Sequence, residues 1–199
     1  VACYVVEGSG NKEFLKVKET MYKSPEFFDQ LIEAITEKTI EHLKMQIKAG
    51  VDIVKLFYSW AGVLSVEAFR KWVIGPTKRI VEALRDAVPA IPIVGFPRGS
   101  GVLYQEYVNE TEVDCVALDQ KTPLNWAKAN LKGAVLQGNL DNTLLAYGSP
   151  EAVANEASRI MEEMVGTPFI FNLSHGVLPE TPVKNVETLI HAVRDYARG

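Results

Sequence analysis

From residue 25 onward, the chain alternates long amphipathic stretches with short apolar ones. Amphipathic stretches are typical of helices, and short apolar runs are typical of buried parallel strands. The most strongly patterned helix is predicted over residues 24–50, with Ser24 as its N-cap, Pro25 at the first helical position and Gly50 at its end. The sequence therefore predicts an α/β fold.

Five strands, each followed by a helix, are expected along the chain. The strands are predicted at residues 51–58, 91–96, 113–118, 133–139 and 168–173. The helices that follow them are predicted at residues 66–88 (with a break near Gly75 and Pro76), 102–110, 123–131, 149–165 and 183–197. No Gly/Ser-rich linker and no strong internal repeat interrupts this order, so residues 1–199 are expected to belong to one domain.

Short polar or glycine-containing segments follow every predicted strand. They read YSWAG (58–62), PRGSG (97–101), DQKTP (119–123), QGNLD (137–141) and NLSHG (172–176). An open doubly wound sheet and part of a (β/α)8 barrel both fit the alternation, but a doubly wound sheet needs functional segments only near a switch point. In a barrel all five segments share the carboxyl-terminal rim, where the active sites of that fold lie. This uniformity favours a partial (β/α)8 TIM barrel.

Composition restricts the partners and the compartment. The net charge of −4 argues against a nucleic-acid surface, and no apolar stretch approaches the roughly 20 residues of a membrane span. Cys3 and Cys115 have no second pair that would complete a metal cluster or a disulfide framework. We therefore expect no nucleic-acid partner, no membrane segment and a cytoplasmic location.

His175 is the first candidate for chemistry. It directly follows the last predicted strand, between Ser174 and Gly176, and an imidazole can donate a hydrogen bond or change charge near neutral pH. A simple turn residue is the competing interpretation. Ser59 has the same place after the first strand, but no GxSxG elbow surrounds it, which disfavours acyl transfer.

Other polar side chains carry weaker signals. Arg98 directly follows a strand and suits an anionic substrate, whereas Asp119 and Asp141 are expected to cap helices rather than act as bases. His42 and His191 lie in predicted helices, where ordinary helix residues are expected rather than metal ligands. Neither GxGxxG nor GxxxxGK[ST] occurs, which disfavours nucleotide binding.

Four sequence blocks together are more specific than any single residue. VEGSG near the start, FYSWAGVLS after the first predicted strand, LQGNLD after the fourth and FNLSHGVLPETP after the fifth occur in this order. In this arrangement the chain resembles the uroporphyrinogen decarboxylase family from residue 1 to residue 199. The resemblance implies a (β/α)8 barrel, of which these residues would supply about five C-terminal strand-helix units.

The resemblance also implies an activity. That family decarboxylates the four acetate side chains of uroporphyrinogen III to give coproporphyrinogen III, without a metal or organic cofactor, in the haem pathway. Its substrate-pocket groups match Tyr4, Ser59 and His175 of this sequence. Family members are commonly homodimers, which implies the same for the full-length protein.

The family's main catalytic groups are expected outside this sequence. The chain opens on VACYVVEGSG, without an initiator methionine or a signal-like region, which indicates a piece of a longer protein. The resemblance places an arginine-bearing RQAGRY-type segment and an FSD-type aspartate before VEGSG, so these 199 residues are expected to be inactive alone. It also places Val1 inside a helix, although the letters CYVV alone favour a strand.

Three positions depart from the family pattern. Tyr58 stands where FDSWAG and FESHAG have an acidic residue, Ser174 replaces the first glycine of NLGHG, and Gln120 stands where tryptophan is common. If the acidic residue supports the pocket, Tyr58 alters its charge. If the glycine needs a positive φ, Ser174 introduces strain.

Two other functions stay open at this point. Related barrel methyltransferases act on corrinoid or thiol substrates and are expected to bind zinc through His and Cys ligands after barrel strands. Neither Cys115, inside a predicted strand, nor Cys3, at the start of the chain, fits that arrangement. The other alternative is a degenerate barrel that binds a tetrapyrrole or a protein partner, which Tyr58 and Ser174 would favour.

Overall fold

The computed structural model of the protein describes residues 1–8 and 13–197. They form two compact units, Val1–Val113 (unit 1) and Asp114–Gly199 (unit 2), and each unit is treated by itself. Ser9 and Gly10, the last two residues of VEGSG, lie outside the described residues. The expectation of a single domain stays a prediction.

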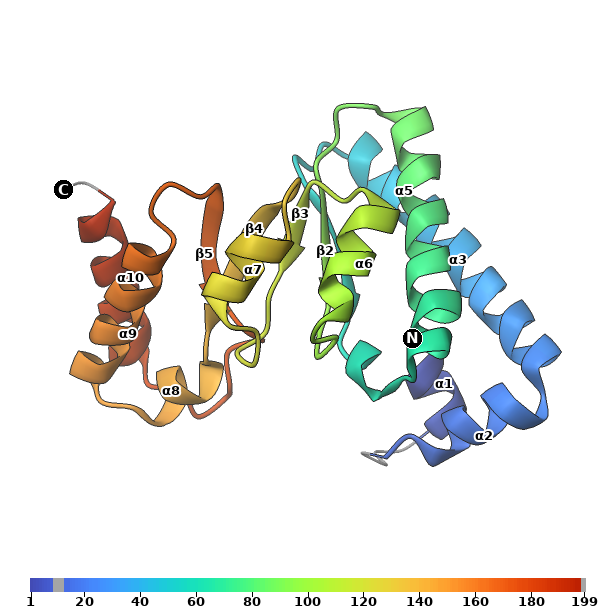
Figure 1. Cartoon of the computed structure of the whole chain (residues 1–199), viewed down its shortest axis with the longest axis horizontal. Helices are drawn as coiled ribbons and strands as arrows, with labels where there is room; N and C mark the ends of the chain where they lie inside the picture. The colour runs from blue at the N-terminus through green and yellow to red at the C-terminus, as the bar shows by residue number, and fades with distance from the viewer. Residues whose placement is uncertain (9–12, 198–199) are drawn as a thin grey trace. The chain divides into compact units, whose positions relative to one another are not determined.

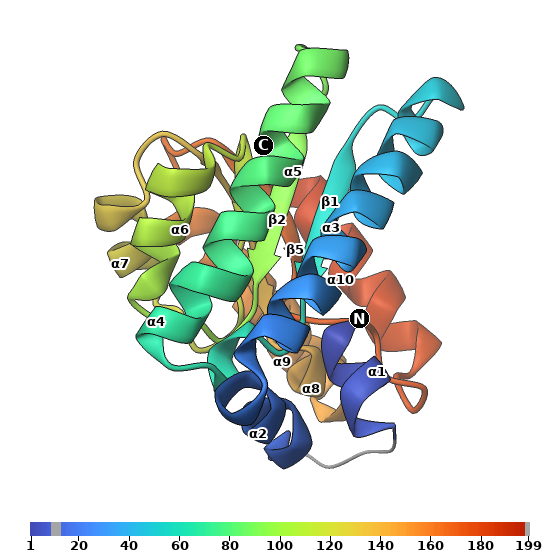
Figure 2. The same cartoon turned by 90° about the vertical axis from the view of Figure 1, so that its right-hand side faces the viewer.

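Unit 1 is built from helices around a pair of parallel strands. Its elements are α1 (Ala2–Glu7), α2 (Leu15–Lys23), α3 (Pro25–Lys48), β1 (Val54–Tyr58), the 3₁₀ turn η1 (Ala61–Val63), α4 (Val66–Phe69), the π-helical segment η2 (Arg70–Ile74), α5 (Gly75–Ala87), β2 (Ile93–Pro97) and α6 (Leu103–Thr111). β1 and β2 pair in register from Val54 beside Ile93 to Tyr58 beside Pro97. The long helices α3 and α5 lie side by side (Figure 2).

Unit 2 repeats the same alternation. Its elements are β3 (Cys115–Ala117), α7 (Leu124–Asn130), β4 (Val135–Leu140), α8 (Asn142–Tyr147), α9 (Pro150–Glu163), β5 (Phe169–Leu173) and α10 (Val183–Tyr196). β4 pairs with both β3 and β5, and all three strands are parallel. Helices α9 and α10 pack closely against each other (Figure 1).

The predicted alternation of strands and helices is confirmed. In both units the parallel strands are neighbours in chain order and are followed by helices, which is the repeat of a (β/α)8 barrel. The helix predicted at residues 66–88 continues through the π-helical segment η2, which ends directly before Gly75, so the break is a local change of helical period. The N-terminal helix that the family resemblance predicted is present as α1.

Two short helices were not expected from the sequence. In α2 the buried residues are Val17 and Met21, and α8 has only six residues. Segments of this length carry too few apolar positions to show a helical period. They form in the folded protein because neighbouring elements pack against them.

The helix-start signals were partly right. The Ser149 hydroxyl accepts a hydrogen bond from the Ala152 amide at 3.1 Å and so caps α9. Ser24 stands at the N-cap of α3, but its side chain makes no capping hydrogen bond. The reason is that Ser24 also ends α2, where its own N–H donates to the Thr20 carbonyl at 2.9 Å, in a backbone conformation that serves both helices.

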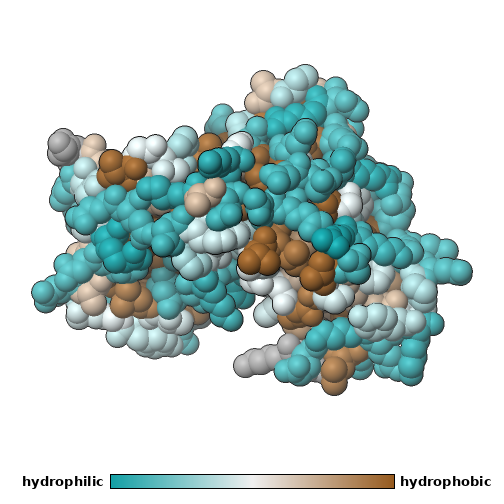
Figure 3. Space-filling view, in the orientation of Figure 1, coloured by the Kyte–Doolittle hydropathy of each residue, from teal (hydrophilic) through white to brown (hydrophobic). Residues whose placement is uncertain are grey.

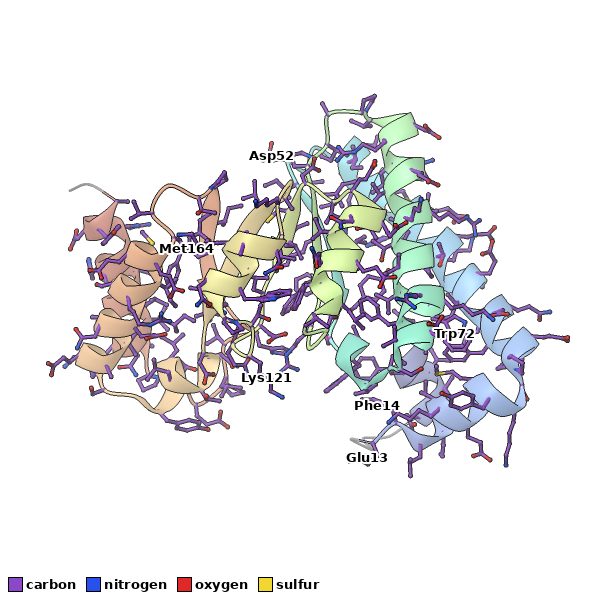
Figure 4. The ribbon with its side chains drawn as sticks, in the orientation of Figure 1. Glu13, Phe14, Asp52, Trp72, Lys121 and Met164 are labelled. Atoms are coloured by element: carbon purple, nitrogen blue, oxygen red, sulfur yellow. The ribbon has the colours of Figure 1, made fainter. Side chains whose placement is uncertain are left out.

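Charged and aromatic contacts join α3 to the π-helical segment η2. Asp29 of α3 accepts hydrogen bonds from Nζ of Lys71 and Nε1 of Trp72, each at 2.8 Å (Trp72 is labelled in Figure 4). The donation from Lys71 lowers the pKa of the Asp29 carboxyl. The ring of Trp72 meets that of Phe28 edge-on at 5.0 Å. At the surface such an ion pair adds little free energy, so the rings contribute more.

The core of unit 1 contains buried tyrosines. Tyr107 of α6 is fully buried, and its hydroxyl has no hydrogen-bond partner among the described residues. A Cβ atom at Gly95 of β2 would overlap the Tyr107 ring and hydroxyl, so only glycine lets this ring lie against the strand. Burial raises the pKa of Tyr107 and of Tyr58 above the usual range of a phenol. The exterior is mostly hydrophilic on the face drawn in Figure 3.

Buried phenols predict that the protein loses stability at high pH. Tyrosines of the unfolded chain ionise from about pH 10, whereas Tyr107 stays protonated in the fold. The folded state therefore holds protons that the unfolded state releases, and the free energy of unfolding falls by about 1.4 kcal/mol per pH unit above about pH 10 for each such group. Urea unfolding at several pH values should show this fall, and Tyr107→Phe should reduce it.

The exposed Tyr22 supplies the matched control for the loss of one phenol. We expect Tyr107→Phe to cost little at neutral pH, because the hydroxyl that it removes has no partner among the described residues. The prediction would be contradicted if the free energy of unfolding fell as steeply above about pH 10 in Tyr107→Phe as in Tyr22→Phe.

Candidate active site

Tyr4 lies on α1, whose position depends on Glu7. The Glu7 carboxylate is buried and accepts the Val17 amide at 3.1 Å, so it satisfies an N–H group in the first turn of α2. This contact fixes the end of α1 against the start of α2. The Tyr4 side chain, one turn before Glu7 in α1, is 68% exposed. The glutamate of VEGSG therefore orients the helix that carries Tyr4.

Ser59 directly follows β1 and is half-buried. Its neighbour Trp60 packs against a hydrophobic cluster formed by residues of α2, α3 and α4, with its ring centroid 4.9 Å from that of Phe14 (labelled in Figure 4). Cys3, the neighbour of Tyr4, packs against the same cluster. The cluster thus links the segments that carry Tyr4 and Ser59.

The segments YSWAG and PRGSG meet through their backbones. The Arg98 amide donates to the Tyr58 carbonyl at 3.2 Å, and the Gly62 amide donates to the Arg98 carbonyl at 3.0 Å. A Cβ atom at Gly62 would lie 2.5 Å to 2.8 Å from the backbone of Gly99, which itself has a φ of +80°. Both glycines are required here, one for close approach and the other for a left-handed backbone.

Gly62→Ala should therefore separate these two segments. Because the obstacle is backbone, it has no side-chain rotamer to move aside, and we expect a loss of about 1–3 kcal/mol in the free energy of unfolding. Urea unfolding followed by tryptophan fluorescence measures the change. Gly75→Ala is the control, since a Cβ there would meet only the carbonyl of Arg70 in η2, at 3.7 Å. Equal stability of the two variants would contradict this account.

Tyr58 lies on the face of β1 that packs against helices. Its hydroxyl forms a hydrogen bond of 3.0 Å with the hydroxyl of Thr77, which in turn donates to the Val73 carbonyl at 2.7 Å. Thr77 belongs to α5, so Tyr58 points toward the helical layer together with Val54 and Leu56. This departure from the family pattern therefore does not place a phenol on the opposite face of the strand pair.

The opposite face of β1 and β2 is aromatic and carries one cation. Phe57 and Phe96 are partners in the strand register, with ring centroids 6.2 Å apart, and Phe57 is 65% exposed. Nζ of Lys55 lies 5.0 Å and 5.3 Å from the centroids of these two rings. Such a surface can hold a flat ring system and favour negative charge.

In unit 2, side-chain amides hold the segments that follow β3 and β4. Nδ2 of Asn139 donates to the carbonyls of Asp119 and Thr122, at 3.0 Å and 2.9 Å. Nδ2 of Asn172 donates to Oε1 of Gln137 at 3.1 Å, across the β4–β5 pair. The asparagine residues of LQGNLD and FNLSHG thus cross-link neighbouring strands and loops.

The capping prediction for the two aspartates was right for one of them. Asp141 caps α8, because its Oδ1 accepts the Thr143 amide at 2.9 Å. Asp119 does not cap α7, whose N-cap is Pro123. Instead its Oδ1 accepts the Lys121 amide at 2.9 Å and closes a turn after β3 (Lys121 is labelled in Figure 4).

His175 is exposed and lies between two anchored residues. The Ser174 amide donates to the Leu140 carbonyl at 2.8 Å, and the Gly176 carbonyl accepts Nδ2 of Asn142 at 2.8 Å. Ser174 itself is fully buried, and its backbone is not in the left-handed region, so serine at this position causes no backbone strain. The expectation of strain was conditional on a positive φ, and that condition is not met.

Because the Ser174 backbone is not strained, replacing Ser174 by glycine should not stabilise the protein. Its buried Oγ has no hydrogen-bond partner among the described residues, so Ser174→Ala should leave the free energy of unfolding unchanged or raise it slightly. Ser174→Gly, which restores the family's residue, should lower it by about 0.4–1 kcal/mol, because glycine gives the unfolded chain more freedom. Thermal unfolding of both variants tests this, and a more stable Ser174→Gly protein would refute it.

Of the three residues predicted for substrate binding, Tyr4 lies within α1, whereas Ser59 and His175 follow the ends of β1 and β5. Tyr4 and Ser59 belong to unit 1, and His175 belongs to unit 2. Sequence reasoning missed side chains that form hydrogen bonds with the neighbouring backbone, above all Glu7 with the Val17 amide and Asn142 with the Gly176 carbonyl. No local signal marks such residues, since their partners are 10 and 34 positions away along the chain.

The remaining candidates are ordinary in their surroundings. His42 and His191 are exposed on helices, as predicted, and Nε2 of His42 contacts Nε2 of Gln46 at 2.9 Å. Cys3 and Cys115 form no disulfide, and the described residues include no group of three or more His, Cys, Asp or Glu side chains arranged to hold a metal ion. Within that same part of the chain, no helix combines the length and apolar character needed to cross a membrane.

Comparison with known proteins decides the family. The family model described as uroporphyrinogen decarboxylase (URO-D) matches residues 1–196. The chain belongs to the uroporphyrinogen decarboxylase family. Uroporphyrinogen decarboxylases of Wolbachia sp. subsp. Drosophila simulans (strain wRi) and Rickettsia massiliae (strain Mtu5) are 48% and 43% identical to it over 196 residues. Each alignment covers 98% of this chain and 56% of the relative, so the chain spans about half the length of these curated relatives.

A solved structure confirms the fold class. A methyltransferase from Methanosarcina mazei superposes with a TM-score of 0.76 over 90% of this chain and 52% of that chain, at 18% sequence identity. At this identity the likeness concerns the fold alone. Together with the parallel strand-helix repeats, it supports part of a (β/α)8 barrel in this member of the uroporphyrinogen decarboxylase family.

Proposed function

We propose that the full-length protein is a uroporphyrinogen decarboxylase, which converts uroporphyrinogen III to coproporphyrinogen III. The observation that carries the proposal is the family match over residues 1–196, with relatives of this name up to 48% identical. Both units are then parts of one barrel domain. The family resemblance further supports a reaction that needs no metal or organic cofactor.

The chemistry asks three things of the protein. In each step a pyrrole ring protonated at carbon accepts the electron pair of the breaking carbon–carboxylate bond, carbon dioxide leaves, and a proton replaces it to complete a methyl group. The protein must therefore hold a polyanion, stabilise a cationic ring and manage protons. The main groups for this, an aspartate and arginines, are those that the resemblance places before Val1.

Residues of this chain have supporting roles in the proposal. His175 and Tyr4 offer hydrogen bonds to the substrate and help to move protons, and Ser59 lines the pocket. The exposed ring of Phe57, which packs on the buried ring of Phe96, offers an aromatic face on which a pyrrole ring can rest, with Lys55 beside it for a carboxylate. Arg98, whose backbone amide donates a hydrogen bond to the Tyr58 carbonyl, supplies a second cation for the acidic substrate.

The family and the composition support proposals for the compartment, the oligomeric state and the partners of the full-length protein. We place the full-length protein in the cytoplasm, where Cys3 and Cys115 stay reduced, as a homodimer without nucleic-acid partners. The net charge of −4 supports the last point. Sedimentation of the full-length protein measures the dimer.

Activity is tested with two proteins. One is the 199-residue chain, and the other, called the extended protein, is this chain joined at its N-terminus to the corresponding N-terminal residues of the Wolbachia relative. We expect coproporphyrinogen formation by the extended protein and none by the 199-residue chain. His175→Gln should lower kcat/KM of the extended protein by about tenfold or more.

His191→Gln is the matched control, because it removes an exposed histidine from α10. We expect this variant to keep the activity of the unmodified extended protein. A folded extended protein that forms no coproporphyrinogen would refute the proposed function. Equal activity of His175→Gln and His191→Gln would refute the role of His175.

A further inference from the structure

The two neighbours of Asp141 in the chain form hydrogen bonds with the two neighbours of His175. On one side the Leu140 carbonyl accepts the Ser174 amide at 2.8 Å, as the last rung of the β4–β5 ladder. On the other side Nδ2 of Asn142 donates to the Gly176 carbonyl, also at 2.8 Å. The first contact is backbone and survives any side-chain change, whereas the second depends on one amide.

Gly176 is exposed, with open space on the side where a side chain would lie. Among the described residues, a Cβ atom at this position would meet nothing within 4 Å, and the residues from His175 to Val177 are exposed. The conformation of the chain after Ser174 therefore depends on polar contacts. The hydrogen bond from Asn142 is one that fixes the backbone directly after the imidazole.

Asn142 is well placed for this task. It is only 6% exposed and lies in the first turn of α8, which Asp141 caps. A buried amide needs a partner, and a rigid helix start leaves its side chain little freedom, so the Gly176 carbonyl is held at a defined position. A helix elsewhere in unit 2 uses the same device: Nδ2 of Asn185, in the first turn of α10, donates to the carbonyls of Leu145 and Gly148.

We propose that Asn142 is a positioning residue for His175, which fixes the loop after β5 so that the imidazole is presented to the tetrapyrrole. The role rests on the proposed function, since that function makes His175 a substrate contact. The effect of Asn142 on the loop itself does not depend on the function and is measured separately.

The first experiment observes His175 in the 199-residue chain. The chain has three histidines, so their imidazole signals can be assigned by His→Gln variants and followed by NMR during a pH titration. In Asn142→Ala we expect the His175 signals and their titration to change, with those of His42 unchanged. Asn185→Ala is the matched control, because it removes amide bonds of the same kind that do not involve the residues next to His175.

The outcome is decisive in either direction. If the His175 signals in Asn142→Ala change no more than in Asn185→Ala, the inference is overturned. Should Asn142→Ala fail to fold, Asn142→Ser replaces it, because serine keeps a polar group in the first turn of α8 but is too short to reach the Gly176 carbonyl.

The second experiment is a double-mutant cycle in the extended protein. We expect Asn142→Ala to lower kcat/KM by about tenfold, the scale at which a misplaced group affects a reaction, and Asn185→Ala to keep the unmodified value. In a His175→Gln background, Asn142→Ala should cause no further loss, because its effect runs through the imidazole. Losses that multiply instead would mean that Asn142 acts on the fold in general and would overturn the inference.

Failure of the proposed function gives a different pattern. In that case the unmodified extended protein forms no coproporphyrinogen, while the NMR comparison of Asn142→Ala with Asn185→Ala still decides whether Asn142 holds His175.

Discussion

Side-chain amides of asparagine hold the loops of unit 2 in place. Loops and helix ends carry backbone carbonyl groups that have no partner within a helix or a strand ladder, and such groups need a donor. The Nδ2 groups of Asn139, Asn142 and Asn185 donate to carbonyls of this kind, and Nδ2 of Asn172 donates to the side-chain Oε1 of Gln137. Each reaches a neighbouring strand, loop or helix, so the conformation of one loop depends on the one beside it.

Unit 1 solves the same problem with backbone contacts and steric fit. Its two strand-end segments meet through hydrogen bonds between amides and carbonyls and through the close approach of Gly62 and Gly99. A buried carboxylate, that of Glu7, secures the start of α2. The segments of Tyr4 and Ser59 are therefore held by packing together with hydrogen bonds, whereas the loop of His175 has a side-chain hydrogen bond from Asn142, which is sensitive to direction and to a single substitution.

The sequence predicted the structure well where the local pattern of a segment decides its conformation. Apolar runs predicted all five strands, and the Ser-Pro pairs predicted the starts of α3 and α9, because such signals lie within a few residues of the element that they start. α2 and α8 were missed because tertiary packing stabilises them more than their own pattern does. CYVV formed a helix although its letters favour a strand, since Cys3 and Val6 pack against a cluster that only the folded chain assembles.

The candidate site was predictable only in part, for the same reason. A residue after a strand is expected at the carboxyl end of a sheet, which placed Ser59 and His175 correctly. The partners of Glu7 and Asn142 are set by the meeting of distant segments, which no local pattern encodes. Tyr58 and Ser174, read as departures with functional weight, turned out to be accommodated by the helical layer and by an ordinary backbone conformation.

The close approach of Gly62 and Gly99 has a consequence for how this part of the protein can vary during evolution. Because the two loops touch through atoms that every residue possesses, their spacing is independent of the side chains around them. The side chain of a neighbouring position such as Arg98 can then change identity without altering this backbone contact. A pair of glycines, neither with any reactive group, thereby lets the chemistry of the two loops diversify on a constant frame.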